Sequence, residues 1–252
     1  MDRLRYLIDY LVDEYDTNLT QVEYDFDSFR RLVNVRQPKE ISDEFLSIQD
    51  AYLSAISQEK GIVEIDSIPA MTHNMCVWQG DITRLNAEAI VNAANKGMVG
   101  CFYPGHHCVD NEIHTYSGVQ LRLACSEIMK AQGYDEPIGG AKITEAYNLP
   151  ANYIIHTVGP IIGLSLYREE EEQLRCCYRN ILELAYEMHL DSVAVCCIST
   201  GEFHFPNHRA CEIAIETVKE IQEKYDDKCK VIFNVFKDVD YYLYCDKIQH
   251  YM

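Results

Sequence analysis

The segment Cys101-Phe-Tyr-Pro-Gly-His-His-Cys108 concentrates metal-binding side chains in one short stretch. Two thiolates and an imidazole, from Cys101, His106 and Cys108, form a ligand set that favours zinc over magnesium or calcium. His106 and Cys108 are two positions apart, so an extended loop points both the same way and His107 away, as a non-ligand. Three protein ligands leave a fourth tetrahedral position open, as catalytic zinc sites do. A zinc ion that only holds the loop together is the alternative.

Asp110 follows this segment directly and has two possible roles. It stands at the start of a helix expected over residues 110–132, where aspartate is a good N-cap. A part in a reaction is implied only by the family resemblance given below. The two roles are compatible.

The elements that must position these residues alternate between strands and helices from about residue 72. The apolar, β-branched strands are typical of a sheet covered on both faces, which predicts a three-layer α/β/α domain with a mixed or largely parallel central sheet. The expected strands are residues 75–79, 89–93, 142–145, 153–158, 192–198 and 230–236. The expected helices are residues 110–132, 168–188, 207–224 and 239–248.

Residues 1–71 differ from the rest and are predicted to form an α-helical N-terminal extension to a domain over residues 72–252. Spacing of Leu4, Leu7, Ile8 and Leu11 indicates a first helix. A second is expected over residues 26–35. A third is expected between a Ser42 cap and Gly61, with an apolar stripe at residues 45, 48, 52 and 56.

Four segments at strand ends carry side chains suited to a nucleotide-like ligand, because open α/β sheets bind ligands at that edge. Asp81 could accept hydrogen bonds from an exocyclic amine, or be only a turn or cap residue. Asn92 and Asn95 could bind sugar hydroxyls. Residues 199–203 could expose consecutive N–H groups to a diphosphate, with Gly201 permitting a sharp turn. Phe236 could stack on a heterocycle, or pack in the core.

Composition excludes several classes of function. A net charge of −18 argues against nucleic-acid binding, which needs a basic face. No apolar run reaches the roughly 18 residues of a membrane span, and the acidic N-terminal segment is unlike a signal peptide. Eleven cysteines without a secretory signal suit a reducing, cytoplasmic location. An NAD-dependent oxidoreductase is disfavoured because no Gly-x-Gly-x-x-Gly turn follows a strand.

Taken together, Gly80-Asp-Ile-Thr83, Val91-Asn-Ala-Ala-Asn95 and Ile198-Ser-Thr-Gly-Glu-Phe203 occur in an order that resembles the macrodomain family of ADP-ribose-binding folds. The resemblance covers about residues 72–250. It implies that Asp81 and Ile82 bind adenine, that Asn95 faces the distal ribose and that Phe236 lies near adenine. It implies that the loop of Ser199, Thr200, Gly201, Glu202 and Phe203 wraps the diphosphate.

The chain departs from an ordinary macrodomain where those members carry a run of glycines. The pattern Cys-Phe-x-Pro-x-His-x-Cys is similar to the zinc-dependent branch, whose members also have a helical N-terminal extension. That resemblance implies a zinc-dependent hydrolase that removes mono-ADP-ribose from modified proteins, with a carboxylate linkage expected and one Zn²⁺ per chain. Asn95 and Asp110 are the implied catalytic residues.

The same resemblance implies a partner: a mono-ADP-ribosylated protein, such as a lipoyl-carrier protein modified by a linked sirtuin. Zinc would either polarise a ribose oxygen or lower the pKa of a bound water towards about 7. Two alternatives remain open. One is a non-catalytic ADP-ribose reader with structural zinc, and the other is an O-acetyl-ADP-ribose deacetylase.

Overall fold

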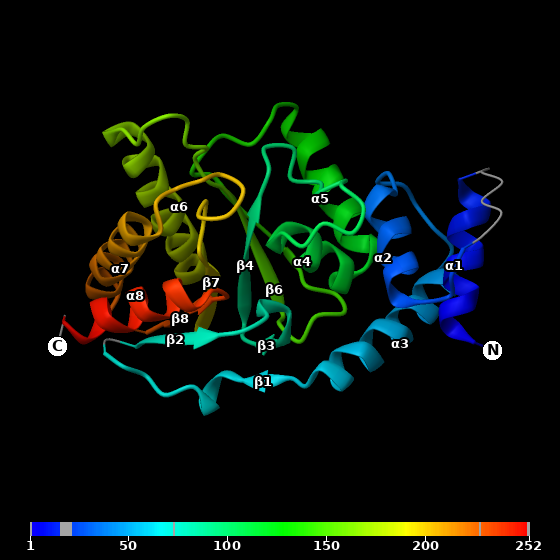
Figure 1. Ribbon diagram of the computed structural model, residues 1–252, viewed down its shortest axis with the longest axis horizontal. Helices are drawn as coiled ribbons and strands as arrows, with labels where there is room; N and C mark the ends of the chain where they lie inside the picture. Colours follow the sequence, from blue (N-terminus) through cyan, green and yellow to red (C-terminus); the bar gives the residue numbers. More distant parts are fainter. Residues whose placement is uncertain (1, 16–21, 73, 227, 251–252) are drawn as a thin grey trace.

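A six-stranded mixed sheet forms the centre of the molecule (Figure 1). The computed structural model describes residues 2–15, 22–72, 74–226 and 228–250. Within them the strand order is β2-β8-β7-β4-β6-β5, and only β5 runs antiparallel to its neighbour. The strands are β2 (Met75–Gln79), β4 (Ala89–Ala94), β5 (Ala141–Glu145), β6 (Tyr153–Val158), β7 (Ser192–Cys196) and β8 (Lys230–Val235). All six were predicted, with bounds that differ by at most two residues at either end.

Helices cover both faces of this sheet, which confirms the three-layer arrangement (Figure 1). Helices α6, α7 and α8 pack together on one side, and α4 and α5 lie on the other. Their bounds are α4 (Val109–Ser117), α5 (Val119–Gln132), α6 (Arg168–Glu187), α7 (Asn207–Lys224) and α8 (Asp238–Gln249). Central strands are buried on both faces: Ile90, Val91 and Asn92 of β4 are wholly inaccessible. This explains why the strand sequences show apolar runs instead of alternation.

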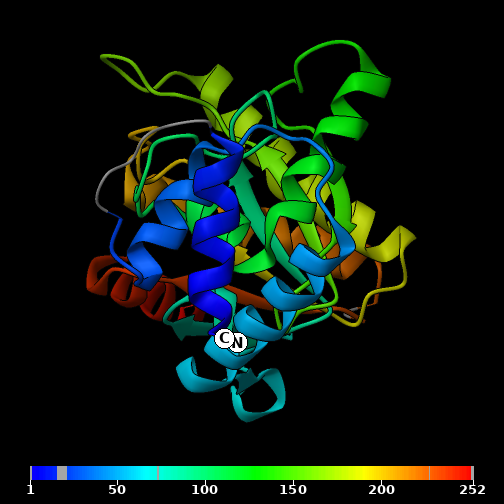
Figure 2. The same cartoon turned by 90° about the vertical axis from the view of Figure 1, so that its right-hand side faces the viewer.

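The predicted helical extension is present as α1 (Arg3–Glu14), α2 (Phe26–Val35) and α3 (Asp43–Lys60). It has its own apolar cluster, to which Val119 of α5 contributes. Figures 1 and 2 show the three helices together at the α4–α5 end of the molecule, far from α8. The Ser42 hydroxyl accepts a hydrogen bond from the Phe45 N–H at 3.2 Å, and Gly61 ends the helix, as expected. The domain boundary after residue 71 stays a prediction.

The buried face of α3 differs from the predicted stripe by one position. The structure buries Phe45, Gln49, Leu53 and Ser57, while Ile48, Tyr52 and Ile56 are only partly covered. Polar contacts explain why the buried face of α3 is rotated from the predicted one. The Gln49 side chain accepts a hydrogen bond from the Val119 N–H at 3.1 Å and donates to Gln120 at 2.8 Å. A buried glutamine with satisfied hydrogen bonds can occupy a face that an apolar pattern would not assign to it.

A short parallel pair, β1 (Val63–Glu64) with β3 (Leu85–Asn86), joins the end of the extension to the segment after β2. Two single-turn 3₁₀ helices accompany it, η1 (Ile65–Ser67) and η2 (Ile82–Arg84). None of these was predicted, because two-residue strands carry no periodic pattern.

The helix predicted over residues 110–132 is two helices separated at Gly118. This residue has φ +99°, in the region that side-chain-bearing residues rarely adopt. An added Cβ would approach the amide ends of Gln120 and Gln49 at 2.5 and 2.6 Å. The N-terminal extension therefore packs closely against the break between α4 and α5. A lone glycine in a helical pattern did not reveal the break, because such residues are tolerated in helices.

Replacing Gly118 with alanine should lower the free energy of unfolding by about 1–3 kcal/mol, since a strained φ and a displaced contact both oppose the native state. Chemical denaturation would measure the change. Gly163→Ala is the matched control, because its φ is ordinary and an added Cβ meets no atom within 4 Å. Equal stability of the two variants would contradict the assigned strain.

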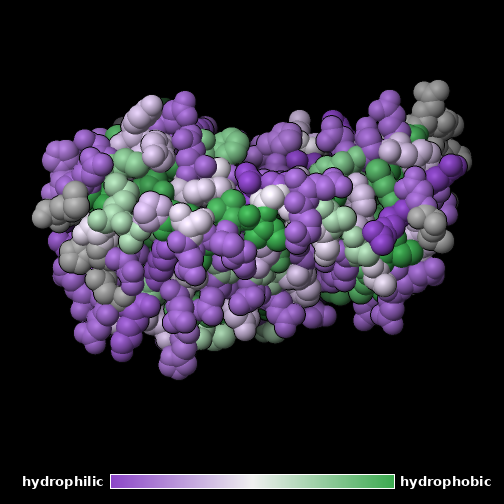
Figure 3. Space-filling model, turned by 90° about the horizontal axis from the view of Figure 1, so that it is seen from below, coloured by the Kyte–Doolittle hydropathy of each residue, from purple (hydrophilic) through white to green (hydrophobic). Residues whose placement is uncertain are grey.

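Figure 3 shows hydrophilic residues over most of one face, with hydrophobic residues gathered only in patches between them. Among the described helices, none is both long and apolar enough to cross a bilayer.

Candidate active site and metal-binding loop

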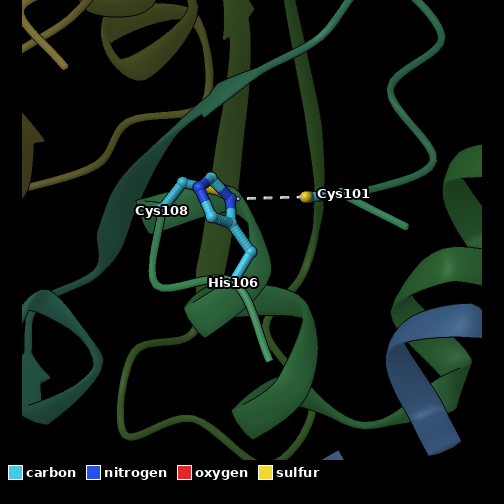
Figure 4. A group of neighbouring side chains, drawn as sticks. All are labelled: Cys101, His106 and Cys108. Atoms are coloured by element: carbon cyan, nitrogen blue, oxygen red, sulfur yellow. Dashed lines mark hydrogen bonds between the residues drawn. The ribbon is translucent and has the colours of Figure 1, made fainter. Parts of the chain in front are cut away.

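The three predicted metal ligands lie together in the loop between β4 and α4 (Figure 4). Each of Cys101, His106 and Cys108 offers one ligand atom, and these atoms lie within 4.8 Å of one another. The Cys101 Sγ and the His106 Nδ1 are 3.6 Å apart. In the described part of the chain, no fourth His, Cys or carboxylate joins the group at that spacing. Two sulfurs and one imidazole nitrogen fit zinc and leave one tetrahedral position for another ligand.

The two adjacent histidines point differently, as predicted. The Nδ1 of His106 faces Cys101, and its Nε2 lies 3.7 Å from the Glu202 Oε1. His107 is largely exposed and its Nδ1 contacts the Glu112 Oε1 at 2.8 Å. A carboxylate beside the distal nitrogen is the usual way in which a metal-ligating histidine is oriented. Glu202 thereby links the predicted diphosphate loop, residues 199–203, to the loop of residues 101–108, which we call the metal-binding loop.

Asp110 lies in the first turn of α4, and the expectation that it caps this helix is wrong. The N-cap position is taken by Cys108, which makes no side-chain cap bond. The Asp110 carboxylate is buried and accepts hydrogen bonds from the Nδ2 groups of Asn92 at 2.8 Å and Asn95 at 3.5 Å. Burial raises the pKa of Asp110 to about 6, although the Asn92 hydrogen bond and the charge of Arg122 oppose the rise. Burial also raises the pKa of the Cys108 thiol, to about 12.

A second buried group, formed by His114, Cys125 and His156, lies beside Asp110, whose Oδ1 is 3.5 Å from the His114 Nε2. It contains possible metal ligands within 4.8 Å of one another. However, both ring nitrogens of His156 already face partners, Asn92 at 3.1 Å and Thr144 at 2.9 Å. Burial lowers the pKa of His156 to about 3, so this ring is neutral. His156 therefore belongs to the polar support of the site, because it contacts the Asn92 amide that holds Asp110.

The two asparagines of β4 and the following loop occupy different environments. Asn92 is fully buried, and its amide holds Asp110. Asn95 is partly exposed. Its Nδ2 donates to the Gly100 carbonyl at 3.1 Å, and its Oδ1 accepts from the Gly97 N–H at 2.9 Å. The structure thus brings Asn95, Asp110 and the metal-binding loop together. Ligand contacts of either asparagine stay predictions.

Asp81 and Phe236 follow the neighbouring parallel strands β2 and β8, whose register pairs Gln79 with Val235. Both therefore lie at the same edge of the sheet. Phe236 is 77% exposed, so its ring is not part of the core. The Asp81 carboxylate already contacts Thr83 at 2.7 Å and the Lys60 Nζ at 2.6 Å.

These contacts determine the charge of Asp81. Burial alone would raise the pKa of this carboxyl, but the hydrogen bonds from Lys60 and Thr83 outweigh it and lower the pKa. The neighbouring Ile82 is buried. Adenine binding by these two residues stays a prediction.

The loop over residues 199–203 follows β7 and adopts a sharp turn, but Gly201 does not provide the positive φ. Ser199 and His204 do, at 64° and 58°. A Cβ added to Gly201 would meet nothing within 4 Å, so glycine keeps this space open. Within the described residues, the N–H groups of 201–203 have no acceptor among the hydrogen bonds of the fold. Such a row of free donors suits an anion.

Comparison with known proteins agrees with this geometry. The family model for the Macro domain matches residues 91–214. A protein-ADP-ribose hydrolase of Treponema medium is 46% identical over 252 residues, covering 96% of this chain and 97% of that protein. The chain belongs to the macrodomain family. A protein-ADP-ribose hydrolase of Staphylococcus aureus strain MSSA476 is also 46% identical, covering 96% of this chain and 93% of its own.

A solved macrodomain from Oceanobacillus iheyensis with ADP superimposes with a TM-score of 0.65 at 36% identity. It covers 70% of this chain, and 90% of its own length is matched. The predicted family, the macrodomain fold with its mixed sheet and the assignment of a hydrolase are therefore confirmed. The structure adds residues that sequence reasoning missed, chiefly Arg30, Asn34 and Lys60 of the extension, each of which contacts the macrodomain.

Proposed function

We propose that this macrodomain is a zinc-dependent hydrolase that removes mono-ADP-ribose from modified protein side chains. The observation that carries the proposal is the meeting of Cys101, His106 and Cys108 beside Asn95 and Asp110. Relatives that match almost the whole chain are named protein-ADP-ribose hydrolase. Together these support hydrolysis of an ADP-ribose linkage at the metal-binding loop.

The ADP-ribose group is proposed to extend along the edge of the sheet where the parallel strands have their carboxyl ends. Asp81 and Ile82 would bind adenine, with the exposed Phe236 stacked beside it. The free N–H groups of residues 201–203 would hold the diphosphate without any basic side chain, which suits a chain of net charge −18. The Thr200 N–H, also expected to contribute, already donates to the Cys197 carbonyl at 3.4 Å. Asn92 and Asn95 are the proposed ribose residues, with Asn95 in direct contact, because Asn92 is fully buried.

The reaction is proposed to occur where the distal ribose meets the metal-binding loop. Zinc held by Cys101, His106 and Cys108 would supply Lewis acidity beside the scissile bond. Asn95 would fix the ribose through its amide. Asp110, held by Asn92, would orient the attacking water or the substrate carbonyl. Glu202 would keep the His106 ring oriented towards the cysteines.

The cognate substrate is proposed to be a carboxylate-linked mono-ADP-ribosylated protein in the cytoplasm. A lipoyl-carrier protein modified by a linked sirtuin is the proposed example, which follows from the resemblance to the zinc-dependent branch. Release of free ADP-ribose from such a carrier tests this. We expect release from a carboxylate ester and none from an arginine linkage. Tight ADP-ribose binding without release from either would contradict the hydrolase and favour a reader.

Asp81→Ala should weaken ADP-ribose binding about 10- to 100-fold, because a charged hydrogen-bond acceptor is lost from the proposed adenine site. Zinc content should not change. Calorimetric titration with ADP-ribose measures the first and metal analysis the second. Lys60→Met is the matched control: it removes the ion pair but keeps the carboxylate, so affinity should be preserved. An unchanged dissociation constant in Asp81→Ala would remove Asp81 from the adenine site.

A further inference from the structure

We infer that helix α2 of the N-terminal extension holds the metal-binding loop in its ligating shape, with Arg30 and Asn34 as positioning residues. The inference rests on the proposed zinc site and assigns a role to the extension. The loop from Cys101 to Cys108 contains no helix or strand of its own. Its one internal backbone hydrogen bond, among the described residues, runs from the His106 N–H to the Tyr103 carbonyl at 3.2 Å, so contacts from outside do much to set its shape.

Asn34 forms the first of these contacts. Its side chain is 1% exposed. The Asn34 Oδ1 accepts a hydrogen bond from the Gly105 N–H at 3.0 Å, and the Nδ2 donates to the Thr115 Oγ1 at 3.0 Å. Gly105 has φ +69° and directly precedes the ligand His106. One buried amide thus bridges α4 and the turn that aims the imidazole.

Arg30 forms the second contact, one helical turn before Asn34. Its Nη2 lies 2.5 Å from the His106 carbonyl oxygen, 2.9 Å from the Asn111 Oδ1 and 2.8 Å from the Glu112 Oε1, and its two hydrogens are shared among these three acceptors. The guanidinium is almost wholly buried, and Glu112 balances its charge. A buried ion pair with several hydrogen bonds fixes geometry more strongly than an exposed one. The backbone of His106 is therefore attached directly to α2.

Cys101, the first of the three proposed metal ligands, is connected to α2 through Arg122 of α5. The Arg122 Nη1 donates to the Asn34 and Arg36 carbonyls at 2.6 and 2.9 Å, and its Nη2 to the Cys101 carbonyl at 3.3 Å. Both Cys101 and His106 thus take their positions from α2 and from Arg36, the residue that follows it. Residues that orient metal ligands from outside typically change metal affinity about 10- to 100-fold when they are lost.

The test compares zinc dissociation constants, measured by chelator competition at a temperature where every variant is folded. Asn34→Ala leaves the Gly105 N–H without its acceptor and should weaken zinc binding about 10- to 100-fold. Asn34→Asp keeps an acceptor at that position and should bind zinc nearly as the wild type does. Leu32→Ala, on the same helix but in the extension's own apolar cluster, should lower stability and leave zinc affinity unchanged.

Each outcome bears on one of two claims: that α2 positions the metal-binding loop, and that this loop binds zinc. Weak zinc binding in Asn34→Ala, with recovery in Asn34→Asp, supports the inference. Wild-type affinity in Asn34→Ala and in Arg30→Met would overturn it while leaving the zinc site in place. Equal losses in Asn34→Ala and Leu32→Ala would also overturn it, because they would show only a general effect of stability. Wild-type protein that takes up no zinc would overturn the proposed function as well.

Discussion

The Cys101→Ala variant should bind no zinc, and its rate of ADP-ribose release should fall about 10³-fold. Cys101 supplies one of three ligand atoms that lie within 4.8 Å of one another, and two remaining ligands bind zinc far less tightly. Metal-ion polarisation is worth several kcal/mol of transition-state stabilisation, and each 1.4 kcal/mol is about tenfold in rate. Metal analysis and a single-turnover release assay on the same preparation would measure both quantities.

The matched control for this variant is Cys245→Ala. It removes one thiol of intermediate burial on α8, outside the metal-binding loop, and should keep both zinc and activity. ADP-ribose affinity should survive in Cys101→Ala, because the adenine and diphosphate segments do not include the loop. Wild-type turnover by a zinc-free Cys101→Ala protein would contradict a catalytic role for the metal.

Asp110→Asn should lower kcat about 10²-fold or more while zinc content and ADP-ribose affinity stay near wild type. The substitution preserves volume but removes the carboxylate that Asn92 holds next to Asn95. Loss of a positioned acid–base or water-orienting group typically costs 10²- to 10⁴-fold in rate. Single-turnover rates under saturating substrate isolate this effect from binding.

An exposed aspartate provides the comparison for Asp110. Asp135→Asn removes a surface carboxylate that pairs with Lys96, and its rate should equal that of the wild type. Asn92→Ala should show an intermediate loss, because Asp110 would remain but lose its 2.8 Å hydrogen bond. If Asp110→Asn retained full kcat, Asp110 would have a structural role only.

Much of the fold could be predicted from the sequence because local signals agree with the tertiary structure. The bounds of α2, α7, β2 and β6 match their predicted ranges. In these segments the apolar periodicity and the flanking caps or turns agree. The grouping of Cys101, His106 and Cys108 was predictable for a similar reason, since the three lie within one short segment. Their binding of zinc stays a prediction that rests on their residue types.

The parts that could not be predicted depend on contacts between distant segments. Arg30 and His106 are 76 residues apart, and Asn34 and Gly105 are 71 apart. No local pattern in α2 distinguishes a buried arginine that binds a loop from an exposed one on a helix surface. The break at Gly118 and the rotated face of α3 have one shared cause, the packing of Gln49 against the start of α5.

Asp81 illustrates the same limit within a recognised motif. Its position after β2 was predictable, but its ion pair with Lys60 was not. That contact joins the end of α3 to the proposed adenine site. The extension therefore contacts the macrodomain both there and at the metal-binding loop, and neither contact is visible in a motif.

The most direct test of the account is a zinc titration of chelator-stripped protein, followed by ADP-ribose release from a mono-ADP-ribosylated carrier. We expect no release without zinc, and then a linear rise in rate that stops at one zinc per chain. A Cys108→Ala protein titrated in parallel should show no rise. Full release by the stripped protein, unchanged by added zinc, would contradict the central claim that the metal-binding loop performs the hydrolysis.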